Sequence, residues 1–294
     1  MKTPPDLLRI LVPLDGSPLS ESILPSLQPL LAARKAELTL LRVISRVEDV
    51  EREKSYLSRL ERDLRKEGVR VGARLEFGRP ADEILHLAKP GRFDFLAMTT
   101  HGHSAILRVI MGSVAARVLR QVEIPLLLHT PKARITDWKR IVVSLDGTAM
   151  AETVLEDVIP LAEVLGSTVH LVRVNLPLLP MGDPYFDPVP IDLEGPRKYV
   201  EEISDRLVKR GILAIPEVRE GFAAREIVKV AARLDAGLIA MATEGRASRA
   251  GAVERSIARE VLPATPCTLL LRRTQSSAAP PDLKILEADP IPTP

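Results

Sequence analysis

The sequence has few aromatic residues and a single cysteine, and both shortages limit what the protein can be. Phe, Trp and Tyr together make up 3% of the 294 residues, so the core must be built from Leu, Val, Ile and Ala. The lone cysteine, Cys267, excludes a disulfide framework and a cysteine-rich metal site. It precedes an apolar run, so we interpret it as a small core residue. This pattern is typical of a protein in the reducing cytoplasm.

Net charge and long apolar runs are also scarce. The formal net charge is only +2, and no basic run is interleaved with aromatic residues, which argues against a nucleic-acid-binding surface. No stretch reaches the roughly 18 apolar residues of a membrane-spanning helix. The N-terminal apolar run is broken by Arg9 and is a poor match to a signal peptide. We therefore expect a soluble, cytoplasmic protein without membrane contact.

What the sequence does contain is a long internal repeat. The segment RILVPLDGSPLSESIL, which begins at Arg9, matches RIVVSLDGTAMAETVL, which begins at Arg140, at an offset of 131 residues. Further along, FLAMTTHGH matches LIAMATEGR at an offset of 143 residues. The second copy therefore holds twelve extra residues (143 − 131), and the proline-rich segment Pro177–Pro196 is their obvious source.

The repeat predicts two tandem domains of similar fold. We place the first domain at 5–131 and the second at 137–274, joined by a short polar segment. The remaining residues, 275–294, are rich in Pro and Ala, and we expect this tail to be disordered.

Within the first copy, apolar runs alternate with amphipathic segments. The expected strands span 9–14, 37–44, 69–78, 93–100 and 125–130, and the expected helices span 17–34 (capped by Ser17 or Ser20), 50–68, 81–89 and 113–122. Strands that are apolar on both sides and alternate with helices predict a mainly parallel sheet covered on both faces. The predicted fold class is α/β, with two doubly wound, Rossmann-like domains of five strands each.

Two predicted loops lie where such sheets bind ligands, beyond the carboxyl ends of the strands. Asp15 ends the first strand, and the sequence TTHG ends the fourth. Gly102 has no Cβ and would let backbone N–H groups approach a ligand closely. Gly112 and Ser113 then lead into a helix expected from Val114, whose first N–H groups favour a phosphate. We interpret the nine residues between the two glycines as a flap over that phosphate.

These motifs resemble the universal stress protein family in its tandem two-domain form, over almost the whole chain except the tail. The family's nucleotide-binding members carry G-x-x-G, nine residues, and then G and S or T after the fourth strand, with an Asp after the first. The first copy matches at Asp15, Gly102, Gly112 and Ser113, and it departs at the first glycine, where Thr99 stands.

The resemblance implies an ATP site in the first copy, with Mg²⁺ accompanying the nucleotide. Asp15 and Val43 would flank the adenosine part, while the backbone at Gly102, Gly112 and Ser113 would hold the phosphates. The full set of residues predicted to contact the nucleotide is Pro13, Asp15, Val43, Thr99, His101, Gly102, Gly112, Ser113 and Val114. The resemblance also implies that the final strands of the two copies pair as an internal pseudo-dimer, and that two chains associate as a homodimer.

The second copy departs further from the family motif. It keeps Asp146 and Gly245, but Ala242 and Arg255 stand at two of the glycine positions. A long side chain at Arg255 blocks the close approach of a backbone to a phosphate, although its guanidinium is itself an alternative phosphate partner. We predict a degenerate site in the second copy.

Several of these residues also have simpler explanations. Asp15 lies in the sequence LDGS, whose residues favour a tight turn even when no ligand is bound. Gly102 and Gly112 are also compatible with ordinary helix boundaries, and Ser113 is expected as an N-cap with or without phosphate. His101 and His103 have no acidic partner at metal-ligand spacing, so we interpret them as loop histidines.

Three functions are compatible with this pattern. The first is an ATP-binding regulatory protein of the stress response, with at most slow ATP hydrolysis, because G-x-S-x-G, H-E-x-x-H and Walker A motifs are absent. The second is a nucleotide-independent scaffold that binds an unidentified protein partner. The third is an enzyme of the adenine-nucleotide hydrolase superfamily, which shares this sheet.

Overall fold

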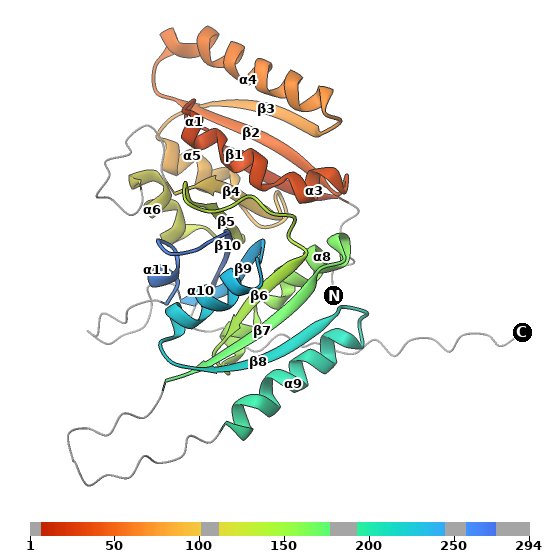
Figure 1. The fold of residues 1–294 in the computed structure, drawn as a ribbon. Coiled ribbons are helices and arrows are strands. Elements are labelled where there is room, and N and C mark those ends of the chain that lie inside the picture. Colours follow the sequence, from red (N-terminus) through yellow and green to blue (C-terminus); the bar gives the residue numbers. More distant parts are fainter. Residues whose placement is uncertain (1–6, 101–111, 177–192, 245–256, 275–294) are drawn as a thin grey trace, which may run out of the picture.

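The computed structural model in Figure 1 describes residues 7–100, 112–176, 193–244 and 257–274. In the first half of the chain the strands are β1 (Leu8–Pro13), β2 (Ala36–Ile44), β3 (Arg70–Phe77), β4 (Phe95–Thr99) and β5 (Leu126–His129). In the second half they are β6 (Arg140–Leu145), β7 (Thr168–Asn175), β8 (Ala214–Glu220), β9 (Leu238–Glu244) and β10 (Thr268–Thr274). The predicted tail, 275–294, lies outside the described residues.

The helices of the two halves follow the same plan. The first half has α1 (Pro18–Glu21), α2 (Ile23–Ser26), α3 (Gln28–Ala32), the 3-10 turn η1 (Val47–Asp49), α4 (Val50–Lys66), α5 (Pro80–Leu87) and α6 (Ser113–Gln121). The second half has α7 (Ala149–Glu152), α8 (Leu155–Leu165), α9 (Glu194–Val208), α10 (Ala223–Arg233) and α11 (Ile257–Val261). No helix among the described residues is both long and apolar enough to cross a membrane.

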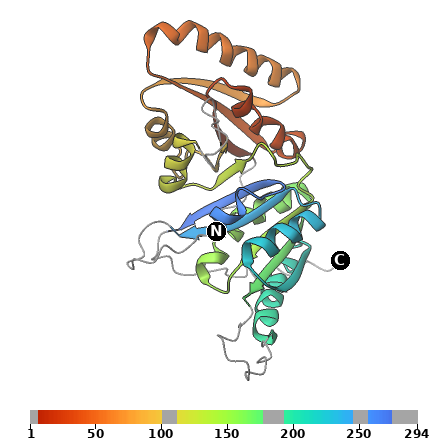
Figure 2. The same ribbon diagram turned by 60° about the vertical axis from the view of Figure 1, so that its left-hand side comes forward.

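All ten strands form a single sheet, in the order β3-β2-β1-β4-β5-β10-β9-β6-β7-β8. Within each half the neighbouring strands are parallel, and the strand order reverses next to β1 in one half and next to β6 in the other. This arrangement confirms the predicted α/β class with two doubly wound, five-stranded halves. Figures 1 and 2 show α4 and α9 at opposite ends of the molecule, each along the outer strands of its half.

Both faces of the sheet are buried because residues alternate along each strand. On β2, for example, Leu38 and Leu40 pack into one hydrophobic cluster with residues of α4, whereas Leu41 and Val43 pack into another with residues of α5 and α6. This double burial explains why the strands read as continuous apolar runs in the sequence.

The helix predicted over 17–34 is broken into the three short pieces α1, α2 and α3. Pro25 and Pro29 lie inside this segment, and a proline lacks the N–H of the helical hydrogen bond and clashes with the preceding turn. Ser17, not Ser20, is the N-cap, and its hydroxyl accepts a hydrogen bond from the Ser20 N–H. The other predicted elements of the first half agree with the structure within two residues at each end.

The two halves meet where β5 and β10 pair in antiparallel fashion. Leu126, Leu127 and Leu128 face Leu271, Leu270 and Leu269 in register, and all six are buried. The predicted pairing of the final strands is thereby confirmed. Because each of these strands occupies the free edge of the other, a homodimer would have to use another surface.

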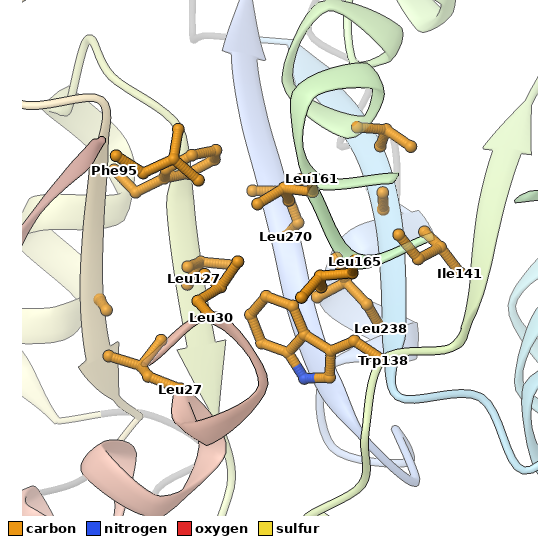
Figure 3. Close-up of a cluster of buried hydrophobic side chains, with 14 of the residues drawn as sticks. Leu27, Leu30, Phe95, Leu127, Trp138, Ile141, Leu161, Leu165, Leu238 and Leu270 are labelled. Atoms are coloured by element: carbon orange, nitrogen blue, oxygen red, sulfur yellow. The ribbon is translucent and has the colours of Figure 1, made fainter. Parts of the chain in front are cut away.

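One core runs beneath this junction. Trp138, which is 1% exposed, lies among Leu30 from α3 and Leu165 and Leu238 from the second half (Figure 3). Side chains from both halves therefore surround the only tryptophan of the chain. Its fluorescence will report on the packing of the two halves together.

The buried carboxyl group of Asp157 on α8 gives the protein a pH-dependent stability. Its Oδ1 accepts a hydrogen bond from Arg272 Nη1 at 2.6 Å, while its Oδ2 is buried without a hydrogen-bond partner. Burial raises the pKa of Asp157 from 3.8 to about 7, although the charge of Arg272 opposes this shift. Between those two pKa values the folded protein keeps a proton that the unfolded chain has released, so stability falls as the pH rises.

We therefore predict that Asp157→Asn changes the pH dependence of unfolding. The amide of the variant does not titrate, so only the wild type should lose the stability that the proton on Asp157 provides. We expect the wild type's free energy of unfolding, minus that of the variant, to fall by about 2 kcal/mol between pH 5 and pH 8. Urea unfolding followed by Trp138 fluorescence at both pH values measures this difference. A difference that stays constant with pH would show that Asp157 keeps its ordinary pKa.

Candidate functional site

A crevice opens at the carboxyl ends of β1 and β4, where the strand order of the first half reverses. It contains about 690 Å³ of empty space, part of which is open to solvent. The reversal point of an open parallel sheet is where small ligands bind. The position of the crevice therefore fits a small-molecule site.

Seven of the nine predicted nucleotide-contacting residues line this crevice. They are Pro13, Asp15, Val43, Thr99, Gly112, Ser113 and Val114. The other two, His101 and Gly102, lie outside the described residues, as does His103. The predicted residues therefore converge on one place although they come from four different parts of the chain.

The crevice has one apolar wall that the motif did not reveal. Pro80 and Ile84 from α5, Met98 from β4 and Ala115 from α6 line it together with Val43. These side chains belong to the hydrophobic cluster on that face of the sheet or lie beside it, so they appear in the sequence as ordinary core residues. Only the fold shows that they also face the crevice.

Asp15 organises the turn after β1. Its Oδ1 accepts hydrogen bonds from the Ser17 backbone N–H at 3.0 Å and from the Ser17 hydroxyl at 2.6 Å. Asp146 repeats this pattern in the second half, with the Thr148 N–H at 2.9 Å and the Thr148 hydroxyl at 2.6 Å. The turn function of the aspartate is thus common to both halves, and Asp15 alone does not identify a binding site.

The start of α6 lines the crevice with Gly112, Ser113 and Val114. Gly112 is the N-cap, with an extended backbone (φ −64°, ψ 154°), and no side chain caps the helix. The expectation that Ser113 is the N-cap was wrong, because Ser113 is already the first helical residue. The first intrahelical bond runs from the Ala116 N–H to the Gly112 carbonyl at 2.8 Å, so the N–H groups of the preceding turn have no partner within the helix.

A backbone hydrogen bond brings this helix start against β4. The Gly112 N–H donates to the Thr100 carbonyl at 2.8 Å, which joins the two ends of the segment between them. The φ of Gly112 is one that any residue adopts, so the backbone at this position does not by itself require glycine. Gly112 lines the crevice and contributes no side chain to it.

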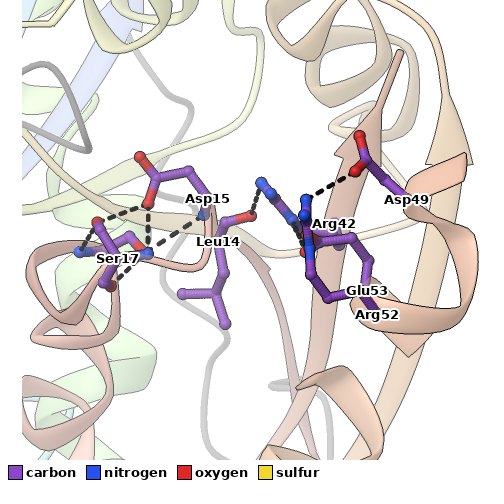
Figure 4. A network of polar contacts seen from close by, with 8 residues as sticks. Leu14, Asp15, Ser17, Arg42, Asp49, Arg52 and Glu53 are labelled. Atoms are coloured by element: carbon purple, nitrogen blue, oxygen red, sulfur yellow. Dashed lines mark hydrogen bonds and ion pairs between the residues drawn. The ribbon is translucent and has the colours of Figure 1, made fainter. Parts of the chain in front are cut away.

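A network of charged side chains lies beside the Asp15 turn (Figure 4). Arg42 on β2 donates through Nε to Glu53 Oε2 at 2.5 Å and through Nη1 to the Leu14 carbonyl at 3.4 Å. Arg52 donates to the other oxygen of Glu53 at 3.0 Å and forms an ion pair with Asp49 at 2.8 Å. The hydrogen bond from Arg42 lowers the pKa of the Glu53 carboxyl group, which keeps it charged although it is buried.

The second half carries the same arginine in different surroundings. Arg173 corresponds to Arg42 at the offset of 131 residues, but Pro196 stands where Glu53 would be at the offset of 143. The Arg173 Nη1 lies 3.3 Å from the position that a Cβ on Gly147 would occupy. Gly245 and Arg255 lie outside the described residues, so the degenerate second site stays a prediction.

The chain matches the model of the universal stress protein family twice, over residues 7–129 and 137–273. A universal stress protein from Synechocystis sp. is 35% identical over 71 residues, which are 24% of this chain and 25% of that protein. A universal stress protein from Methanocaldococcus jannaschii is 34% identical over 61 residues, which are 21% of this chain and 36% of that protein. These matches thus span only about a quarter and a third of the lengths of the two relatives.

Solved structures agree with the fold over about nine tenths of the chain. The crystal structure of a universal stress protein from Archaeoglobus fulgidus aligns with 90% of this chain over 98% of its own length, with a TM-score of 0.74 and 19% sequence identity. A putative universal stress protein from Pseudomonas aeruginosa covers 91% and 93%, with a TM-score of 0.65 and 18% identity. Because the family model matches each half of the chain, this protein belongs to the universal stress protein family. It is a tandem, two-domain member whose two halves share one sheet.

Proposed function

We propose that this protein is a cytoplasmic, adenine-nucleotide-binding regulator of the stress response, and that ATP binds in the crevice of the first half. The observation that supports this proposal is the convergence of Asp15, Val43, Thr99 and the start of α6 on one crevice. The two sides of the crevice differ in chemistry, as the two ends of a nucleotide do.

The apolar wall and the polar helix start suit different parts of ATP. Val43, Ile84 and Met98 offer apolar surface to the flat adenine ring. The N–H groups at Ser113 and Val114, together with the positive end of the dipole of α6, favour the negatively charged phosphates. Asp15 lies on the β1 side, where its carboxylate would accept hydrogen bonds from ribose hydroxyl groups.

Magnesium fits this site as a companion of the nucleotide. Among the residues that line the crevice, Asp15 supplies the one carboxylate. No group of three or more His, Cys, Asp or Glu that could hold a metal occurs among the described residues. When bound, Mg²⁺ would neutralise phosphate charge, and the phosphates and water would supply most of its oxygen ligands.

A regulatory role fits the crevice better than rapid catalysis does. A general base must be free to take a proton from water, and Asp15 Oδ1 already accepts two hydrogen bonds from Ser17. We expect any ATP hydrolysis to be slow. The nucleotide would then act by favouring one conformation of the segment that follows β4.

Isothermal titration calorimetry of the purified protein with ATP and Mg²⁺ tests this function. We expect saturable binding of one nucleotide per chain at or below millimolar ATP, and little release of phosphate over the same period. The absence of saturable binding at millimolar ATP would contradict the proposal. Rapid turnover would instead favour an enzyme of the nucleotide-hydrolase type.

The second candidate is a scaffold that binds a protein partner without nucleotide. The observation that favours it is on the second half, where Leu176 and Phe222 are 64% and 58% exposed next to the carboxyl ends of β7 and β8. Exposed large apolar side chains are common at protein interfaces. Partner capture that is unchanged by ATP and lost in a Leu176→Ser, Phe222→Ser variant would support this function.

A further inference from the structure

We propose that Glu53 and Arg42 form a brace that positions the Asp15 turn for ligand binding, with Glu53 acting through Arg42. This inference rests on the proposed nucleotide site. It assigns to that site Glu53, which lies outside the crevice, as a positioning residue for Arg42, which lines the crevice. The family motif does not include either side chain. The brace is visible in Figure 4 between the turn after β1 and the first turn of α4.

The guanidinium of Arg42 connects the first turn of α4 with the backbone that follows β1. On one side its Nε holds the Glu53 carboxylate of α4 at 2.5 Å. On the other side its Nη1 reaches the carbonyl of Leu14, the residue directly before Asp15, at 3.4 Å. The Leu14 N–H is fixed as well, because it donates to the Leu41 carbonyl of β2 at 2.8 Å. The backbone that leads into Asp15 is thus held at both its N–H and its carbonyl group.

Burial makes this brace stiff. Glu53 is only 5% exposed, and both of its carboxylate oxygens accept hydrogen bonds from arginines. Charge-assisted hydrogen bonds are stronger than neutral ones, and leaving a buried charge without its partner is costly. Arg42 therefore has little freedom to leave Glu53 and move with the turn.

The second half shows what happens to the same arginine without the carboxylate. Pro196 replaces Glu53, and in the described part of the chain no carboxylate lies within ion-pair distance of Arg173. Its guanidinium lies instead against Gly147, in the turn that corresponds to the Asp15 turn. Arg42 thus has a buried carboxylate partner, whereas Arg173 has none among the described residues.

The expected function of the brace follows from this contrast. An anchored Arg42 keeps Asp15 in one position before the ligand arrives, so binding does not have to order the turn. Since Asp15 lies on the adenosine side of the proposed site, the brace should affect adenosine and ATP equally. A contact with the phosphates would affect ATP alone.

Glu53→Gln tests the brace, because it keeps the shape of the side chain and removes its charge. We expect the Kd for ATP and the Kd for adenosine both to rise about 10-fold, which corresponds to about 1.4 kcal/mol. Glu61→Gln is the matched control, since Glu61 is on the same helix and pairs with Arg65 at 2.5 Å. This control should leave both Kd values unchanged.

A double variant decides whether Glu53 acts through Arg42. If it does, Arg42→Gln with Glu53→Gln binds no more weakly than Arg42→Gln alone. Additive losses would overturn the brace, and so would an unchanged Kd in Glu53→Gln.

A measurement without ligand separates this inference from the proposed function. Hydrogen exchange of the amides at 14–17 should accelerate several-fold in Glu53→Gln, while exchange of the corresponding turn of the second half should stay the same. Faster exchange in a protein that binds no nucleotide would refute the proposed function and leave the brace standing. Unchanged exchange would refute the brace even if the wild type binds ATP.

Discussion

Gly112→Arg is expected to abolish ATP binding, with a loss of at least about 100-fold in affinity, or about 2.7 kcal/mol. The backbone at Gly112 has an ordinary φ of −64°, and its N–H bond to the Thr100 carbonyl is made by the main chain, so the fold should accept the substitution. The new side chain would begin at the wall of the crevice and fill the space next to the start of α6. Arginine is also the residue that the second copy carries at the corresponding position, Arg255.

Two variants serve as controls for this experiment. Gly195→Arg introduces the same residue in the first turn of α9, where a Cβ would meet nothing within 4 Å, and it should bind ATP like the wild type. Gly112→Ala adds one methyl group and should have an intermediate effect. Titration calorimetry gives the affinity, and Trp138 fluorescence shows whether each variant is folded. ATP binding by Gly112→Arg at wild-type affinity would place the ligand elsewhere.

Gly237→Ala is expected to destabilise the protein by about 3 kcal/mol or more. A Cβ at this position would lie 2.5 Å from the Trp138 backbone nitrogen, 2.6 Å from the Trp138 Cα and 2.6 Å from the Thr136 Oγ1. Backbone atoms cannot rotate away as a side chain can, so either β9 or the segment through Trp138 must move. Trp138 already has a left-handed backbone (φ 54°) and packs between the two halves.

Gly72→Ala is the matched control for this prediction. Gly72 lies in β3, and a Cβ there would meet nothing within 4 Å, so the substitution should change the stability little or raise it slightly. Urea unfolding followed by Trp138 fluorescence compares the two variants in the same way. Equal stabilities of Gly237→Ala and Gly72→Ala would mean that the contact with Trp138 relaxes without cost.

The repeat makes the fold unusually predictable from the sequence. Each copy independently shows the same strand and helix pattern, and the apolar final strands indicate the pairing that β5 and β10 make. The carboxyl-end rule for parallel sheets then predicts that the loops holding Asp15 and Thr99 open at the same edge of the sheet. These predictions depend on the hydrophobic periodicity of each segment, which can be read from the sequence, and on a general rule for parallel sheets.

What the sequence does not reveal depends on contacts across the fold. Arg42 and Glu53 are on a strand and a helix whose periodicities differ, so their spacing in the sequence does not predict an ion pair. Trp138 lies in a connecting segment, where a large apolar residue has no periodic pattern to place it. The breaks between α1, α2 and α3 follow from Pro25 and Pro29, which the expectation of one helix over 17–34 did not take into account.

The β5–β10 pairing has a consequence for how the two copies can change. In a dimer of identical chains, every substitution appears at both sites, so a residue that one site needs is fixed at the other as well. Here the partners are joined in one chain and paired by one sheet, so their association does not depend on protein concentration. A difference such as Glu53 against Pro196, or Gly112 against Arg255, affects one half only. Because the two copies are parts of one chain, the residues at the carboxyl ends of their strands are free to differ.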